Sequence, residues 1–202
     1  MNRISSDAPI APTRDQPRHR YALLVIDMIN QFDFPNAESA RQQLPDVVPR
    51  IRALREAADR TQSPTIYIND NFGEWHSERS RMIARVKKNK EIAPVLPRPF
   101  DYFVIKPQFS GFYATNLPVL LPKLGINRLI LAGVATEMCV FVTAADAHMR
   151  DYRLWVPSDV VVSVCPSHGH AALEIMEYSM GACVAPSTDQ DVSRWFEPDQ
   201  ER

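Results

Sequence analysis

The order of apolar and polar residues along the chain predicts that strands and helices alternate. Short continuous apolar runs are typical of strands buried on both faces, and an apolar residue at every third or fourth position is typical of a helix. Strands are predicted at residues 21–27, 64–69, 101–106, 128–133, 153–157 and 182–185, and helices at about 46–62, 75–89, 114–124, 137–150 and 167–180. This alternation predicts a three-layer α/β/α fold, in which helices cover both faces of a central, mainly parallel six-stranded sheet.

Length and composition predict one folded domain. We expect a flexible N-terminal tail at residues 1–18, a single domain at 19–195 and a C-terminal tail at 196–202. The formal net charge of −1 gives no reason to expect a nucleic acid or a membrane surface as a partner. We see no secretory signal, no run long enough to span a bilayer and no disulfide framework in the three cysteines, so we expect a cytoplasmic protein.

Three apolar runs are each followed by a chemically useful side chain. One run ends at Asp27, another ends at Lys106, and a third precedes a helical pattern whose first turn contains Cys139. Parallel strands end at a common edge, where ligands bind in α/β proteins, so we expect the three side chains to meet there. Taken singly, Asp27 could cap a helix, Lys106 could be solvated and Cys139 could pack as a small hydrophobe. Their shared position favours a catalytic site.

Four stretches of the chain carry a family resemblance, at residues 23–28, 104–107 with 109–113, 131–136 with 139–140, and 144–147. In sequence and order they resemble motifs of the isochorismatase-like cysteine hydrolases, which include nicotinamidases, N-carbamoyl amidases, ureidoacrylate amidohydrolases and isochorismatases. The resemblance covers the chain from about residue 21 to about 186. It implies that Asp27 is a general base, Lys106 its charged partner and Cys139 the nucleophile. It also implies a cis peptide bond between Val134 and Ala135.

These three groups suit the cleavage of a C–N bond in a small amide, ureide or carbamoyl substrate. Cys139 would attack the carbonyl carbon while Asp27 takes the thiol proton, giving a thioester-type intermediate without a cofactor. The backbone N–H groups of Ala135 and Cys139 are expected to bind the oxyanion. Because Lys106 favours the thiolate, we also expect Cys139 to be alkylated faster than Cys165 or Cys183.

Two other functions fit the same residues. An isochorismatase cleaves a vinyl ether, which requires an acid but no thiol, so the presence of Cys139 weighs against it. A non-catalytic binding or redox-sensing protein could keep the fold, although an intact set of three groups argues against this. We expect a small-molecule substrate and a homo-oligomer, either a dimer or a tetramer.

No metal site is expected. Nicotinamidases resemble one another in an Asp-x-His segment after the second strand, and here Phe72 stands where that histidine would be. Asp70 and His76 remain, but two ligands rarely hold a metal. His168 and His170 are explained more simply as capping or surface residues.

Aromatic residues that follow the predicted strands are candidates for a substrate pocket that suits an apolar or planar substrate. They are Phe32, Trp75, Phe112 and Tyr113. The alternative is that they pack in the core or at an interface, as aromatic residues often do. Thr136 is a further candidate: it could orient the turn beside the substrate, or it could cap the helix.

Overall fold

The computed structural model describes residues 21–76 and 78–189, so the expected tails at 1–18 and 196–202 lie outside the described residues. The strands form one sheet in the order β3-β2-β1-β4-β5, with β6 also paired to β4, and each of these pairings is parallel. Their bounds are β1 (Tyr21–Ile26), β2 (Thr65–Asp70), β3 (Tyr102–Lys106), β4 (Arg128–Val134), β5 (Arg153–Trp155) and β6 (Val161–Val162). The predicted six-stranded α/β sheet is confirmed.

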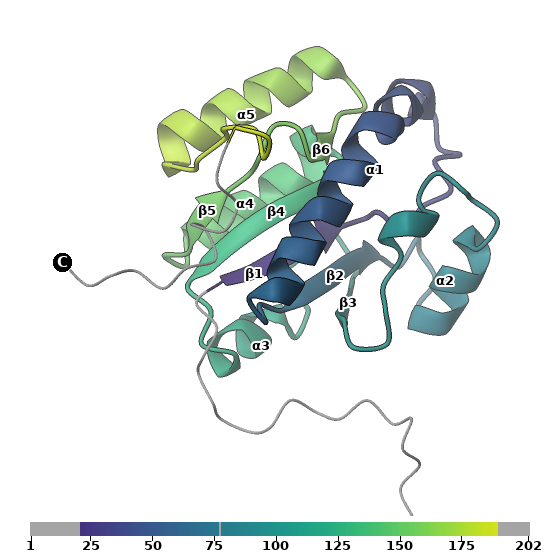
Figure 1. Cartoon of the computed structure of the whole chain (residues 1–202), viewed down its shortest axis with the longest axis horizontal. Coiled ribbons are helices and arrows are strands. Elements are labelled where there is room, and N and C mark those ends of the chain that lie inside the picture. The colour runs from purple at the N-terminus through teal and green to yellow at the C-terminus, as the bar shows by residue number, and fades with distance from the viewer. Residues whose placement is uncertain (1–20, 77, 190–202) are drawn as a thin grey trace, which may run out of the picture.

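Helices cover both faces of this sheet, which gives three layers (Figure 1). Buried residues of α1, α2 and η1 pack on one face, and buried residues of α3, α4 and α5 pack on the other. The helices are α1 (Ala37–Arg60), α2 (Arg79–Val86), the 3₁₀ turn η1 (Ala93–Val95), α3 (Leu117–Lys123), the π-helical turn η2 (Thr136–Val140), α4 (Phe141–His148) and α5 (Pro166–Met180). None of the helices in the described part of the chain combines the length and the apolar character that crossing a bilayer requires.

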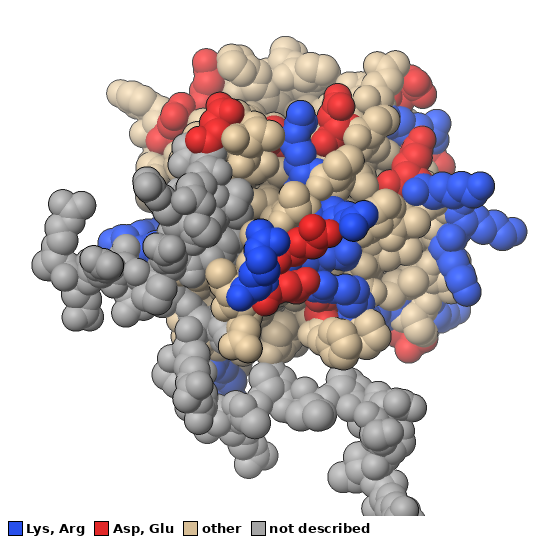
Figure 2. Space-filling view, viewed as in Figure 1, with Lys and Arg blue, Asp and Glu red and all other residues tan. Residues whose placement is uncertain are grey.

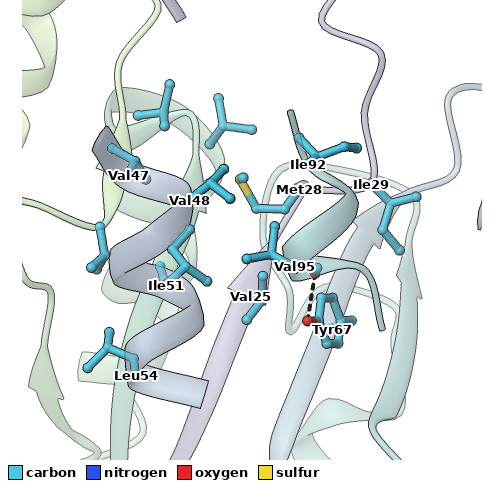
Figure 3. Close-up of a cluster of buried hydrophobic side chains, with 14 of the residues drawn as sticks. Val25, Met28, Ile29, Val47, Val48, Ile51, Leu54, Tyr67, Ile92 and Val95 are labelled. Carbon is cyan, nitrogen blue, oxygen red and sulfur yellow. Dashed lines mark hydrogen bonds between the residues drawn. The ribbon is translucent and has the colours of Figure 1, made fainter. Parts of the chain in front are cut away.

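The central strand β1 is buried on both sides. Leu23 and Val25 belong to the hydrophobic cluster under α1, whereas Leu24 and Ile26 belong to the cluster on the opposite face. Figure 3 shows part of the first cluster, with the apolar face of α1 directed at the sheet. There the Tyr67 hydroxyl donates to the carbonyl of Val95 at 2.7 Å, which ties β2 to η1. This packing fixes the positions at which the strands end.

Two predicted elements differ most from the structure, and α2 also begins at Arg79 rather than at residue 75. Helix α1 begins at Ala37, not near residue 46, and it contains Pro45 and Pro49. Each proline removes a helix hydrogen bond, but the buried apolar face of α1 offsets this loss. The predicted strand at 182–185 is also wrong, because only Cys183 forms an isolated bridge, to Trp155. The sixth strand is β6, whose two residues are too few to show a pattern in the sequence.

Candidate active site

Three strand ends bring Asp27, Lys106 and Cys139 together. Asp27 follows β1, Lys106 is the last residue of β3, and Cys139 lies in η2 after β4. The Lys106 Nζ is 2.8 Å from Asp27 Oδ2, and it donates to Cys139 Sγ at 3.4 Å. The thiol of Cys139 also hydrogen-bonds to the Asp27 carboxylate. The three predicted catalytic side chains therefore form one hydrogen-bonded group, and their catalytic roles stay a prediction.

The end of β2 holds Asp27 in place. Asp27 has a left-handed backbone with φ 51°, and its N–H donates to the carbonyl of Ile68 at 2.8 Å. The N–H of Asp70 donates to Asp27 Oδ1 at 2.6 Å. Two residues beyond Asp27, the N–H of Ile29 donates to the side chain of Asn69 at 3.0 Å. The carboxylate is thus oriented by backbone contacts on one side and by Lys106 on the other.

Glycine is required where β4 meets β1. Gly133 has φ +122°, and a Cβ built there would lie 2.0 Å from the carbonyl oxygen of Ile26. This close approach brings the turn after β4 next to Asp27, since Ile26 and Gly133 are paired in register. One residue further along, the peptide bond between Val134 and Ala135 is cis.

Cys139 sits in a π-helical turn rather than in the first turn of an α-helix. The N–H groups of Met138 and Val140 both donate to the carbonyl of Ala135, at 3.0 and 3.1 Å. Such wide turns are frequent at functional sites. Ala135 and Cys139, the expected oxyanion donors, lie at and within this turn, and their role stays a prediction.

Burial dominates the electrostatics of this group. It raises the pKa of Asp27, and the attraction of Lys106 offsets only part of that effect. Burial by itself disfavours the charged form of Lys106, but Asp27 and Cys139 more than compensate, so the pKa of the ammonium is raised. Burial and the neighbouring Asp27 carboxylate raise the pKa of Cys139 to about 12. The resting site therefore contains an ammonium and a neutral thiol.

The expectation that Cys139 is alkylated faster than Cys165 or Cys183 stays a prediction, and the electrostatics of the resting site oppose it. The Cys139 thiol is kept protonated by burial and by Asp27, which outweigh Lys106. Cys165, by contrast, has a lowered pKa, because the Ser167 hydroxyl and the backbone of His168 hydrogen-bond to its sulfur. The prediction relied on the positive charge of Lys106, whereas the degree of burial of the thiol cannot be read from the sequence.

A second carboxylate, which sequence reasoning considered only as a metal ligand, also contacts the group. Asp70 Oδ2 lies 3.4 Å from Lys106 Nζ, and Asp70 Oδ1 accepts the N–H of Phe72 at 2.6 Å. Its side chain is 30% exposed, compared with 6% for Asp27, so Asp70 is the carboxylate that faces solvent. Asp70 ends β2 in register with Lys106. Its position after the predicted second strand placed it at the same edge of the sheet, but its contact with Lys106 depends on the register between β2 and β3.

The four candidate aromatic residues do not form one pocket wall. Phe32 and Phe112 are buried in the two hydrophobic clusters on opposite faces of the sheet, which favours the packing alternative for both. Trp75 and Tyr113 are 80% and 61% exposed, so they are accessible to a ligand. Contact with substrate stays a prediction for all four.

Thr136 is fully buried at the start of η2, and its hydroxyl has no hydrogen-bond partner in the described part of the chain. The N-cap of this turn is Ala135, without a side-chain cap, which removes the capping alternative. A role beside the substrate stays a prediction for Thr136.

A cavity of about 290 Å³ lies between the loop after β1 and helix α2. Its walls combine apolar and polar side chains: Ile29, Asn30, Gln31, Asp33, Phe72, Met82, Arg85 and Val86. Ile29 and Phe72 each come two residues after a carboxylate of the site, Asp27 and Asp70. Asp27, Lys106 and Cys139 are not among the residues that line the cavity, and sequence reasoning did not identify it.

Among the described residues, no group of three or more His, Cys, Asp or Glu side chains is placed to hold a metal ion. Asp70 is engaged with Lys106 and Phe72, and the side chain of His76 is exposed. Metal independence stays a prediction to be tested by chelation.

Comparison with known proteins identifies the family. The model of the isochorismatase domain matches residues 21–189. The uncharacterized isochorismatase family protein YaaI of Bacillus subtilis is 37% identical over 159 residues, which cover 77% of this chain and 88% of YaaI. The ureidoacrylate amidohydrolase RutB of Stutzerimonas stutzeri is 25% identical over 207 residues, which cover 83% of this chain and 82% of RutB.

A solved structure gives the same result. The crystal structure of N-carbamoylsarcosine amidase from Thermoplasma acidophilum is similar with a TM-score of 0.66 and 28% identity, over 85% of this chain and 99% of that one. Since the family model matches most of the chain and the fold agrees, this protein belongs to the isochorismatase family of hydrolases.

Proposed function

We propose that this protein is a cysteine hydrolase that cleaves the C–N bond of a small amide, ureide or carbamoyl compound. The observation that carries the proposal is the hydrogen-bonded group of Asp27, Lys106 and Cys139 at the carboxyl edge of the sheet. Two relatives named for their activities, an N-carbamoylsarcosine amidase and a ureidoacrylate amidohydrolase, support the same bond type.

The first step is attack by the Cys139 sulfur on the carbonyl carbon. Since the thiol is protonated at rest, its proton must leave as the C–S bond forms, and the hydrogen-bonded Asp27 is placed to accept it. The raised pKa of Asp27 makes this carboxylate a stronger base than an ordinary aspartate. Lys106 contacts both Asp27 and Cys139. Its positive charge therefore stabilises the negative charge whether that charge is on the carboxylate or on the sulfur.

The tetrahedral intermediate then collapses. Backbone N–H groups of Ala135 and Cys139 are proposed to stabilise its oxyanion. Asp27 returns the proton to the leaving nitrogen as the C–N bond breaks, which releases an amine or ammonia and leaves a thioester on Cys139. Asp27 next removes a proton from water, which attacks the thioester and releases the acid. The proton returns to the thiol, so the site ends as it began.

The test is a screen for ammonia release from amides, ureides and carbamoyl amino acids. Wild-type protein should release ammonia from at least one compound, and Cys139→Ala should reduce turnover by at least about 10³-fold. Cys165→Ser is the matched control, because Cys165 is a free thiol outside the group, and it should keep wild-type activity. Substantial turnover in Cys139→Ala, or conversion of isochorismate without any ammonia release, would contradict the proposal.

The oligomeric state and the cellular compartment also stay predictions. We propose that the protein works as a homo-oligomer in a reducing cytoplasm, which agrees with its three free cysteines. Light scattering coupled to size-exclusion chromatography would measure the oligomeric state, and a monomer at micromolar concentration would contradict this part of the proposal.

A further inference from the structure

A single carboxylate attaches the turn that holds Cys139 to the start of helix α5. The Oε1 atom of Glu137, two residues before Cys139, accepts the N–H of Val164 at 3.0 Å and the N–H of Cys165 at 2.7 Å. Cys165 is the N-cap residue of α5, so both N–H groups lie just ahead of its first helical turn. Hydrogen bonds to a carboxylate are stronger than those between neutral groups. Glu137 therefore joins η2 to a segment that is distant in the sequence.

Close packing of the neighbouring residue supports the same attachment. A Cβ built on Gly169, near the start of α5, would lie 1.8 Å from Ser163 Oγ and 3.7 Å from Thr136 Cβ. The backbone of α5 therefore lies directly against these two residues. Thr136 is fully buried there. The first two residues of η2 are thus held by α5, Thr136 through packing and Glu137 through hydrogen bonds.

Glu137 differs from an ordinary surface carboxylate. Figure 2 shows acidic side chains, in red, at the surface of the molecule, which is the usual position for such groups. Glu137 is half-buried, and its Oε2 is buried without a hydrogen-bond partner in the described part of the chain. Burial of an unpartnered polar atom is unfavourable. The two bonds to Oε1 and the packing of η2 on α5 must therefore offset this penalty.

The position of Cys139 depends on support from outside the turn, because η2 has π-helical geometry, which is rare and departs from the regular α-helix. The Cys139 sulfur lies 3.4 Å from Lys106 Nζ and is hydrogen-bonded to Asp27. A misplacement of about 1 Å in a reacting group can lower a rate by about 100-fold. Movement of η2 away from α5 would therefore affect catalysis.

We propose that Glu137 is a positioning residue: by holding η2 against the start of α5, its carboxylate fixes the sulfur of Cys139 within the catalytic group. This inference rests on the proposed function, because it takes Cys139 to be the nucleophile. The competing explanation is that Glu137 only stabilises the N-terminus of α5, as acidic groups at helix N-termini do. The experiments below separate the two roles.

Gln43 provides a matched control. From α1, its Nε2 donates to the carbonyl of Ser163 at 2.7 Å and its Oε1 accepts the N–H of Ser163 at 3.0 Å. Gln43 therefore also holds the connection between β6 and α5 through two bonds, but from the side of α1 (Figure 1). Both Gln43→Ala and Glu137→Ala should lower Tm, whereas only Glu137→Ala should disturb the catalytic group.

The first measurement is the pH dependence of Cys139 labelling by 2,2′-dithiodipyridine, which requires no substrate. The other two cysteines are replaced by serine, and circular dichroism checks that each variant is folded. Burial and Asp27 raise the pKa of the Cys139 thiol, so a sulfur that moves out of the group should titrate at lower pH. We expect Glu137→Ala to lower the midpoint of the profile by at least about one pH unit. Glu137→Gln, which keeps an oxygen acceptor, and Gln43→Ala should shift it by less than about 0.3.

The second measurement is steady-state hydrolysis of N-carbamoylsarcosine and ureidoacrylate, the compounds for which two relatives are named. We expect Glu137→Ala to lower kcat at least about 30-fold, with KM changed less than about threefold. Glu137→Gln should recover most of this loss, and Gln43→Ala should stay within about threefold of the wild type. If the wild type hydrolyses neither compound and the labelling profiles shift as expected, the positioning role is supported and hydrolysis of these compounds is contradicted.

Three results would overturn the inference. The first is an unchanged labelling profile in folded Glu137→Ala protein. The second is an equal shift in Gln43→Ala, which would indicate only a weakened connection before α5. The third is a Glu137→Gln protein as impaired as Glu137→Ala. If Glu137→Ala does not fold, Glu137→Asp replaces it, because this variant keeps the charge on a shorter side chain. Its labelling profile should shift in the same direction, and an unchanged profile would count equally against the inference.

Discussion

Replacing Asp27, the proposed general base, should make Cys139 more reactive toward a thiol reagent while it abolishes hydrolysis. The Asp27 carboxylate raises the pKa of Cys139 both by its charge and by the hydrogen bond that it accepts from the thiol. Asp27→Asn removes the charge, and Lys106 then remains as the ion nearest the sulfur. We therefore expect the pKa of Cys139 to fall in this variant and to rise further in Lys106→Met.

The size of the effect follows from the charge interaction. Two unit charges about 4 Å apart interact by about 4 kcal/mol at an effective dielectric constant of about 20, which corresponds to about three pH units. Cys139 is only partly buried, so we discount this to about two pH units, or about 100-fold more thiolate at neutral pH. A less basic thiolate is intrinsically less nucleophilic, by about eightfold for this change. The net expectation is labelling about tenfold faster.

The assay is the reaction with 2,2′-dithiodipyridine, in a Cys165→Ser/Cys183→Ser background where Cys139 is the remaining thiol. The released thiopyridone gives the rate at neutral pH, and circular dichroism checks that the variants are folded. Asp27→Asn should label faster than the background protein, and Lys106→Met should label more slowly. An Asp27→Asn protein that labels at the same rate or more slowly would refute the electrostatic account of this site.

Three further predictions follow from the geometry. Asp70→Asn should lower kcat/KM about tenfold, equivalent to roughly 1.4 kcal/mol, because it frees Lys106 from a second carboxylate; unchanged kinetics would make Asp70 a bystander. Exhaustive chelation should leave turnover unchanged, and loss of activity that zinc, iron or manganese restores would revive a metal role for Asp70 and His76. Gly133→Ala should lower the free energy of unfolding by about 3 kcal/mol. Gly73→Ala is the control, because Gly73 is also at positive φ but has open space around the Cβ, and it should lower the free energy of unfolding by about 1 kcal/mol. Equal denaturation midpoints for the two variants would contradict the steric argument.

The sequence predicted the catalytic group because each member follows a continuous apolar run, and such runs identify buried parallel strands. Asp70 was not assigned to that group because its contact with Lys106 depends on the register between β2 and β3, which the apolar pattern does not contain. The protonated state of Cys139 was missed for a related reason, since burial is a property of the folded molecule. Phe32 follows a strand end as predicted, yet it turns into the core.

The cavity and the start of α1 could not be predicted from the sequence, for a different reason. The cavity is bounded by segments far apart in the sequence, from Ile29 to Val86, and no local pattern brings them together. In α1, Pro45 and Pro49 are strong local signals against a helix, and the packing of Leu44, Val48 and their neighbours overrides them.

The π-helical turn at Cys139 makes chain length itself a constraint on how this protein can evolve. Helix α4 starts directly after η2, and Thr143, Ala144 and Ala147 form its buried face. Each residue of a helix advances the side-chain direction by about 100°. Loss or gain of one residue between Val134 and Thr143 would therefore turn either the sulfur away from Lys106 or the buried face of α4 away from the sheet. Substitutions can change this segment gradually, but single-residue insertions and deletions cannot, so divergence in length should be confined to other loops.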